Sequence, residues 1–170
     1  MTSTQRSPTT GDQAPDFTLP AILDQNKTEG AFRLFDTLNK LNSGGVVLFF
    51  YPKDNTPGCT IEAIEFTENL EAFAKAGVMI IGISPDPIKM HHKFIDKQSL
   101  QVILVSDEEK TALEAYSVWV EKSMFGRKYM GVERSTFLIN SKGTIAKAWR
   151  KVKVKGHVDE VLEAALAINV

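Results

Sequence analysis

The sequence has a single cysteine, Cys59, among its 170 residues. One cysteine cannot form an intramolecular disulfide, which excludes a small secreted fold held by disulfides and also a CxxC redox pair. Whatever chemistry this thiol performs, it performs alone or completes with a partner molecule. An isolated cysteine is often an inert core residue, so a structural role has to be weighed against a reactive one.

The chain also lacks an excess of either charge and any long apolar run. Its 20 basic and 21 acidic residues leave a formal net charge of -1, which gives no general attraction to nucleic acid or to an anionic membrane. No apolar run approaches the roughly 20 residues needed to cross a bilayer, and residues 1–12 are polar, unlike the apolar part of a signal peptide. We therefore expect a cytoplasmic protein that acts on a small ligand.

Signals for cofactors and metal ions are missing as well. The sequence has no phosphate-binding loop and no dinucleotide fingerprint, so no bound cofactor is expected. His91 and His92 fall on a helix expected to be exposed, and with one cysteine and no matching cluster they predict no metal site. The basic run from Arg150 to Lys155 alternates with apolar residues, which indicates a solvated edge strand.

The length, together with a hydrophobic content of 43%, fits one domain with a full core. Residues 1–10, rich in Ser, Thr and Pro, predict a disordered tail, and the domain is expected over residues 11–170. Strands expected at 46–51, 78–84 and 102–106 alternate with helices expected at 60–76, 88–98 and 107–116. Residues 135–152 predict a hairpin and 157–167 a last helix, whereas 118–131 are left between strand and loop. This alternation predicts an α/β fold, with helices covering a sheet.

Cys59 lies where the first of these strands passes into the first turn of a helix. Unpaired backbone N–H groups at a helix start favour an anion, and the pKa of reactive cysteines there falls to about 3.5 to 7.5. Pro57 disfavours helical backbone at Thr56, so the helix is expected to start after it, and Gly58 permits a close approach. Thr56 either caps this helix or presents its hydroxyl to a ligand. Pro52 by itself indicates the end of the strand.

Arg134 is the best candidate for a second cation near the thiol. It immediately precedes an apolar strand, so it is expected at the end of a sheet. Its guanidinium is permanently charged and can both stabilise a thiolate and hold an oxygen atom of a ligand. Glu62, one helical turn after Cys59, opposes thiolate formation and fits the site if it pairs with an arginine and orients it.

These residues resemble a known family. Pro52, Thr56 and Cys59 have the spacing of the PxxxTxxC signature of the peroxiredoxins. The longer run 51–60, together with the run 131–139 that contains Arg134, is similar to the bacterioferritin comigratory protein (PrxQ) subfamily. The similarity extends from residue 11 to the last expected helix, which is nearly the whole chain.

The resemblance implies a thioredoxin-like fold, with a central mixed sheet flanked by helices, and thiol-dependent reduction of hydrogen peroxide and organic hydroperoxides. It implies that Cys59 is the peroxidatic nucleophile and that its sulfur becomes a sulfenic acid. By the same resemblance, Thr56, Arg134 and backbone N–H groups would hold the peroxide. Pro52 would pack over the thiol and shield the sulfenic acid from solvent.

The chain departs from the subfamily in its lack of a resolving cysteine. Many PrxQ proteins carry one five residues after the first, where this chain has Ile64, and others carry one on a later helix, here around Leu113. We therefore expect a one-cysteine mechanism in which an external thiol forms a mixed disulfide with Cys59 and a second thiol clears it. The expected reductant is thioredoxin, or glutathione with glutaredoxin. The resemblance favours a monomer, with a dimer through the helix-mouth face as the alternative.

Rival functions remain open at this stage. A thioredoxin-like thiol-disulfide oxidoreductase uses the same fold but normally needs a CxxC pair. In a non-enzymatic binding or chaperone module the cysteine would be structural, and Cys59→Ser would leave the activity intact. A papain-like cysteine hydrolase would need a histidine base, and the pattern brings none of the three histidines to Cys59.

Overall fold

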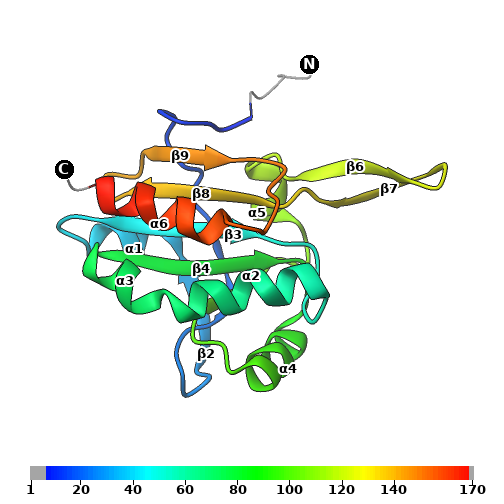
Figure 1. The fold of residues 1–170 in the computed structure, drawn as a ribbon, viewed down its shortest axis with the longest axis horizontal. Coiled ribbons are helices and arrows are strands. Elements are labelled where there is room, and N and C mark those ends of the chain that lie inside the picture. Colours follow the sequence, from blue (N-terminus) through cyan, green and yellow to red (C-terminus); the bar gives the residue numbers. More distant parts are fainter. Residues whose placement is uncertain (1–6, 169–170) are drawn as a thin grey trace.

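A single mixed β-sheet runs through the middle of the molecule, as seen in a computed structural model that describes residues 7–168 (Figure 1). Its seven strands lie in the order β2-β1-β5-β4-β3-β8-β9. They are β1 (Thr18–Ile22), β2 (Glu29–Arg33), β3 (Gly45–Phe50), β4 (Val78–Ser84), β5 (Ile103–Ser106), β8 (Ser135–Asn140) and β9 (Ile145–Trp149). β3, β4 and β5 are parallel to one another, whereas β8 is antiparallel to β3 and β9 is antiparallel to β8, so the mixed sheet is confirmed.

The central strand β3 is buried on both faces, which explains its uninterrupted apolar sequence. Val46, Leu48 and Phe50 point into one core, and the residues between them point into the other. Because side chains alternate along a strand, β3 divides the protein into two hydrophobic layers. The strand expected at 46–51 is therefore confirmed, and its far end delivers the chain to Cys59.

Helices cover both faces of the sheet (Figure 1). One face carries α2 (Pro57–Glu68), α3 (Leu70–Lys75), α4 (Ile88–Gln98) and α6 (His157–Ala167), and the other carries α1 (Leu34–Asn39) and α5 (Thr111–Ala115). The helices expected at 88–98 and 157–167 are confirmed, as is the β8–β9 hairpin. Within residues 7–168, no helix combines the length and the apolarity that a membrane span requires.

The helix expected at 60–76 is in fact two helices, α2 and α3, separated at Asn69. Asn69 leaves the helical region, with φ -104° and ψ 6°, and its side-chain amide donates a hydrogen bond of 2.8 Å to the Glu65 carbonyl. Asparagine competes in this way for backbone groups that a continuous helix would use. Ile61 of α2 is 51% exposed, while Cys59 and Phe66 occupy the buried face.

The segment from residue 107 to 132 also differs from expectation. The expected helix at 107–116 shortens to α5, because Asp107 stands before it and accepts hydrogen bonds from the N–H groups of Thr111 and Leu113, each at 2.8 Å. The undecided residues 118–131 form a hairpin of β6 (Trp119–Met124) and β7 (Arg127–Val132). This hairpin is a separate two-stranded sheet that projects from the body of the protein (Figure 1).

Arg150 shows that the basic run after β9 is not a solvated edge strand. β9 ends at Trp149, and the Arg150 guanidinium donates hydrogen bonds to the carbonyls of Tyr116, at 3.0 Å, and Pro8, at 2.8 Å. The expectation failed because an alternating pattern does not reveal carbonyl partners supplied by distant loops. Residues 1–6 of the predicted tail lie outside the described residues, so the tail stays a prediction.

Candidate active site

Cys59 is the third residue of α2 and is 1% exposed. The chain leaves β3 at Phe50, and Thr56 occupies the N-cap position with extended backbone, φ -90° and ψ 154°. The helix starts at Pro57 itself, three residues before the expected start at residue 60, because proline is well suited to the first helical position. The first intrahelical bond runs from the Thr60 N–H to the Thr56 carbonyl, so the N–H groups of Gly58 and Cys59 precede it.

Arg134 reaches this turn from the segment that joins β7 to β8. Its Nη2 donates a hydrogen bond of 3.3 Å to the Cys59 sulfur, and its Nη1 donates one of 2.7 Å to Oε1 of Glu62. The side chain is 16% exposed, so water screens these contacts only in part. The expected pairing of Glu62 with an arginine is therefore present, and Arg134 joins the thiol to the carboxylate.

Glu62 is fully buried, and its Oε2 has no hydrogen-bond partner among the described residues. Burial raises the pKa of this carboxyl from 4.5 to about 7, while the charge and hydrogen bond of Arg134 pull in the opposite direction. Desolvation wins because a carboxylate loses more by leaving water than one partner restores. The Glu62 carboxyl therefore changes its charge near neutral pH. Two hydrogen bonds through Arg134 connect it to the Cys59 sulfur.

Gly58 makes room for the arginine. A Cβ atom at this position would lie 3.2 Å from Nη2 of Arg134, which is closer than such contacts normally come. The sequence predicted a close approach at Gly58, and the group that approaches is the guanidinium. Any larger residue would push Nη2 away from the Cys59 sulfur.

Thr56 and Pro52 stand on the segment that precedes α2. The Thr56 side chain makes no capping bond; its hydroxyl instead donates to the Lys53 carbonyl at 2.7 Å and keeps its lone pairs for another donor. Pro52 follows directly after the buried Tyr51 and is half-buried. Thr56 thus adjoins the start of α2, Pro52 lies five residues before Pro57 on the same segment, and the chemical roles of both stay predictions.

A buried polar network holds this segment in place. Tyr51 donates a hydrogen bond of 2.6 Å to Oδ1 of Asp54, and Oδ2 of the same carboxylate lies 2.6 Å from Nδ1 of His91. Nε2 of His91 lies 3.0 Å from the Val105 carbonyl. A carbonyl only accepts, so Nε2 carries a proton, and one further proton lies between His91 and Asp54. The expectation of an exposed His91 is wrong: its exposed fraction is 0%.

The network continues to the carboxyl ends of β4 and β5. The Asp54 N–H donates to Oδ2 of Asp86 at 2.8 Å, the Ser84 hydroxyl donates to the same oxygen at 2.7 Å, and the Ser106 hydroxyl donates to the Asp86 carbonyl at 2.6 Å. Burial raises the pKa of Asp86, which these hydrogen bonds partly offset. The segment leading to Cys59 is therefore fastened to two neighbouring strands.

Sequence reasoning missed this network. The only available signal was an aspartate inside the 51–60 run that the peroxide chemistry did not use. Its partner His91 lies 37 residues further on, and nothing in the local pattern connects the two. Long-range pairing of buried polar groups needs the fold.

His157, at the start of α6, is also buried, with Nε2 2.7 Å from the hydroxyl of Thr136. Burial, reinforced by the positive charge of Arg134, lowers its pKa from 6.5 to about 4. The imidazole is therefore neutral at pH 7, and its Nε2 is engaged by the hydroxyl of Thr136. Within residues 7–168, no three His, Cys, Asp or Glu side chains gather in a group that could hold a metal ion.

Comparison with known proteins agrees with this geometry. Residues 10–148 match the model of the AhpC/TSA family. Peroxiredoxin Bcp of Bacillus subtilis is 47% identical over 153 residues, which cover 90% of this chain and 92% of that protein. Peroxiredoxin Bcp of Xanthomonas campestris is 48% identical over 122 residues, covering 72% and 76% of the two chains.

Solved structures give the same result. Peroxiredoxin Q of Xanthomonas campestris superposes with a TM-score of 0.78 at 40% identity, covering 91% of this chain and 92% of that one. Another structure, of Xanthomonas campestris bacterioferritin comigratory protein, concerns its alkyl peroxide reduction activity and superposes with a TM-score of 0.76 at 40% identity, covering 89% and 90%. The thioredoxin-like fold implied by the sequence is thereby confirmed. The chain belongs to the AhpC/TSA family and is a peroxiredoxin of the Bcp/PrxQ group.

Proposed function

We propose that this thiol-dependent peroxidase runs a one-cysteine cycle on Cys59, with Arg134, Thr56 and Pro52 as the other site residues. The observation that carries the proposal is the hydrogen bond of 3.3 Å from Arg134 Nη2 to the only sulfhydryl of the chain, at the first turn of a helix. A guanidinium at this distance interacts favourably with negative charge on sulfur and on a peroxide oxygen.

In the first half of the cycle, the Cys59 thiolate attacks the nearer oxygen of a hydroperoxide. The S–O bond forms as the O–O bond breaks, and the departing oxygen takes a proton and leaves as water or an alcohol. Sulfur is oxidised to sulfenic acid while the peroxide is reduced by the same two electrons. Arg134 and the N–H groups of Gly58 and Cys59 are placed to stabilise the charge that develops on the departing oxygen.

Thr56 and Pro52 take complementary roles in the proposal. The Thr56 hydroxyl already donates to Lys53, so it would accept a hydrogen bond from the protonated oxygen of the peroxide. Pro52 brings apolar surface to the same side and limits the access of water to the sulfenic acid. We propose hydrogen peroxide and alkyl hydroperoxides as substrates, and the alkyl peroxide reduction studied in the Xanthomonas campestris relative supports the alkyl class.

In the second half, an external thiol attacks the sulfenic sulfur, releases water and forms a mixed disulfide. A second thiol then attacks the sulfur of the reductant and returns Cys59 to the thiolate. Position 64, where many subfamily members place a resolving cysteine, holds Ile, and the sequence has no cysteine besides Cys59, which supports external resolution. Because Cys59 is 1% exposed, the incoming thiol needs a movement of the segment that the Asp54 network fastens.

The proposal also covers the cellular compartment and the oligomeric state of the protein. Thiol reductants keep cysteines reduced in the cytoplasm, so the cycle fits that compartment. For the assembly we propose a monomer, on the resemblance to the PrxQ subfamily. Cell fractionation and analytical ultracentrifugation test these two points.

The decisive assay is peroxide consumption by the purified protein, with dithiothreitol, glutathione plus glutaredoxin, or thioredoxin supplied in turn. We expect consumption by the wild-type chain with dithiothreitol and with at least one of the protein reductants, and none above background by Cys59→Ser. Full activity of Cys59→Ser would overturn the proposal. Rapid insulin reduction without peroxide consumption would point to a disulfide oxidoreductase instead.

A further inference from the structure

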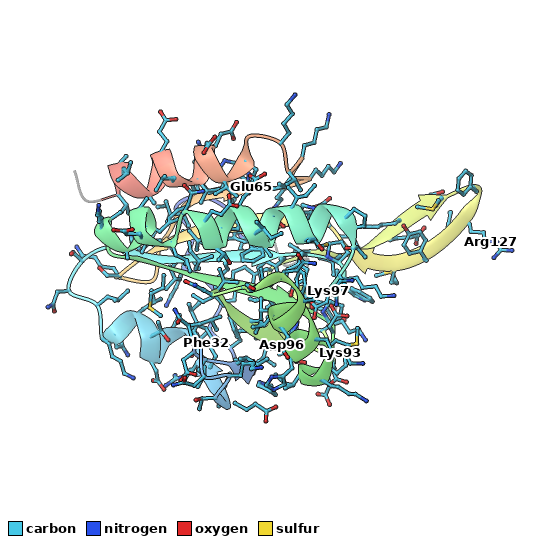
Figure 2. The ribbon with its side chains drawn as sticks, turned by 60° about the horizontal axis from the view of Figure 1, so that its bottom comes forward. Phe32, Glu65, Lys93, Asp96, Lys97 and Arg127 are labelled. Atoms are coloured by element: carbon cyan, nitrogen blue, oxygen red, sulfur yellow. The ribbon has the colours of Figure 1, made fainter. Side chains whose placement is uncertain are left out.

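The β6–β7 hairpin is largely exposed along both strands. Cross-strand pairs run from Trp119 and Val132 at its base to Met124 and Arg127 at its far end. Both views show it extending away from the helices and the main sheet, and Arg127 points into solvent near its tip (Figure 1, Figure 2). A two-stranded hairpin without a covering layer gains little stability from its own contacts.

The hairpin nevertheless exposes a group of large apolar side chains. Four of the seven exposed large hydrophobic residues among those described belong to it: Met124 at 56%, Phe125 at 97%, Tyr129 at 44% and Met130 at 49%. Exposed apolar groups of this size, gathered in one place, mark interaction sites on soluble proteins. Nothing within the described fold packs on Phe125.

Phenylalanine is also an unfavourable residue type at the turn position that Phe125 occupies. It has φ 51° and the following Gly126 has φ 77°, so both turn residues adopt positive φ. Such two-residue hairpin turns favour Asn-Gly, and a bulky aromatic residue with positive φ is strained. Neither the turn nor the core explains an aromatic residue here, which leaves contact with another molecule.

The two faces of the hairpin differ in charge. On one face Glu121 and Lys128 form an ion pair of 3.7 Å. On the other face, Lys122 pairs with Tyr129 and Arg127 with Met124 across the strands, and neither cation forms an ion pair within residues 7–168. This second face, which we call the cationic face, presents Lys122, Arg127, Met124 and Tyr129, and Phe125 stands at its end. It fits a surface with an apolar centre and carboxylates around it.

The hairpin is continuous with the active site. β7 ends at Val132, the Glu133 N–H donates to the Val118 carbonyl at 2.8 Å and closes the base, and Arg134 is the next residue. Each strand has six residues, so the hairpin is about 20 Å long. A surface of that length fits within the area that one partner contributes to a standard interface, roughly 800 Å². A protein held on the hairpin therefore stands beside the edge that holds Cys59.

We propose that the cationic face and Phe125 form the docking surface for a protein dithiol reductant whose reactive thiol lies on an apolar surface bordered by carboxylates. This inference rests on the proposed function, because Cys59 has no internal partner. The docked dithiol attacks the Cys59 sulfenic acid, water leaves, and the second thiol of the reductant displaces Cys59; the reductant is oxidised to a disulfide while Cys59 is reduced.

A second copy of the chain fits this surface less well. Two hairpins meeting through their cationic faces would bring like charges together, which costs free energy. The chain as a whole carries a formal net charge of only -1, so it offers little general attraction to a cationic surface. A hairpin that instead bound another part of a second copy would make a head-to-tail contact, which tends to continue into open assemblies.

The test separates the two half-reactions by stopped-flow. The test variant is Phe125→Asn, since Asn-Gly is the preferred turn sequence and should leave the hairpin folded. The control is Leu166→Asn, which removes another exposed apolar side chain, 56% exposed, from α6. Each protein is oxidised with hydrogen peroxide and then reduced with dithiothreitol, with glutaredoxin plus glutathione, or with a thioredoxin of acidic net charge.

We expect Phe125→Asn to slow reduction by the better protein reductant roughly tenfold or more, as for a central interface residue. Peroxide oxidation and reduction by dithiothreitol should stay at the wild-type rate, and Leu166→Asn should match the wild type throughout. Replacing Lys122 and Arg127 by glutamine should slow the protein reductant at low salt and much less at high salt.

Unchanged reduction of Phe125→Asn by both protein reductants would overturn the docking surface and leave the peroxidase cycle intact. Equal slowing with dithiothreitol would also overturn it, because a docking residue has no effect on a small thiol. If Phe125→Asn changed the oligomeric state and left the rates of reduction unchanged, the hairpin would be a surface for self-association and the docking surface would be overturned. Failure of the wild-type chain to consume peroxide with dithiothreitol would contradict the proposed function itself.

Discussion

Arg134 holds the buried carboxylate of Glu62 at 2.7 Å with one nitrogen and the sulfur of Cys59 at 3.3 Å with another. The cation next to the thiol is therefore shared with an acid whose pKa burial raises to about 7. Between pH 4.5 and about 7, the folded protein holds a proton on Glu62 that the unfolded chain releases, so this group lowers stability as pH rises through that range.

The first prediction follows from this sign. Wild-type protein should lose stability relative to Glu62→Gln as pH rises from about 5 to about 7, by at most about 3 kcal/mol, and the difference should level off above that. Urea unfolding of both proteins across this range measures it. The comparison cancels the opposite effect of His157, whose lowered pKa removes stability as pH falls from 6.5 to about 4. Parallel curves for the two proteins would show that Glu62 is ionised throughout.

The second prediction separates the structural from the chemical role of Arg134. Arg134→Gln should slow peroxide oxidation by roughly 10² to 10³, as removal of a charge-stabilising donor does. It should also destabilise the fold, since Glu62 is left buried without its cation. The double variant Arg134→Gln/Glu62→Gln should recover most of the stability and none of the rate. If the double variant regained the rate, the loss would come from an unpaired carboxylate and not from a missing cation.

The third prediction concerns Gly58. In Gly58→Ala the new Cβ would lie 3.2 Å from Nη2 of Arg134, so the guanidinium has to move away from the sulfur by a few tenths of an ångström. Small displacements of a positioned group are costly in rate, and we expect peroxide oxidation to slow several-fold to roughly tenfold. Alanine in a helix also removes the entropic cost of glycine, so stability should rise by about 0.5 to 1 kcal/mol. A slower and less stable variant would contradict this explanation.

The fourth prediction uses the neighbouring histidines of α4 as a matched pair. His91→Leu leaves Oδ2 of the buried Asp54 without its histidine partner and should cost about 3 to 5 kcal/mol of unfolding free energy. His92→Leu removes only a surface pair with Glu29, 3.3 Å apart, and should cost no more than about 1 kcal/mol. Chemical denaturation measures both. Equal costs would mean that the Asp54 network does not hold the segment before α2.

The same network should affect the chemistry of the folded protein. Once the folded fraction is accounted for, His91→Leu should raise the KM for peroxide or lower kcat, because the segment carrying Thr56 loses its anchor. His92→Leu should leave both constants unchanged. Normal kinetics in folded His91→Leu would limit the network to a purely structural role.

The sequence predicted the parts of the fold that depend on local patterns. The apolar run of β3, the β8–β9 hairpin and the helices at 88–98 and 157–167 were predicted because burial and turn residues are visible in the chain itself. The group around Cys59 was predicted largely through the resemblance, since spacing alone does not bring Arg134 to Cys59 across 75 residues.

The failures have a common physical cause. His91 was expected in solvent because histidine counts as polar, yet it lies on the same helix face as Phe94 and Ile95 and meets Asp54 inside the core. The break at Asn69 and the carbonyl partners of Arg150 likewise depend on hydrogen bonds that only the fold creates. Polar groups paired over long distances are the part that periodicity does not reveal.

The most direct test of the central claim is an intact-mass measurement after one equivalent of hydrogen peroxide, with no thiol present. We predict that the protein gains the mass of one oxygen atom, that peptide mapping places it on Cys59, and that added dithiothreitol removes it. A chain that keeps an unmodified thiol while the peroxide stays unconsumed would contradict the claim that Cys59 is the peroxidatic nucleophile.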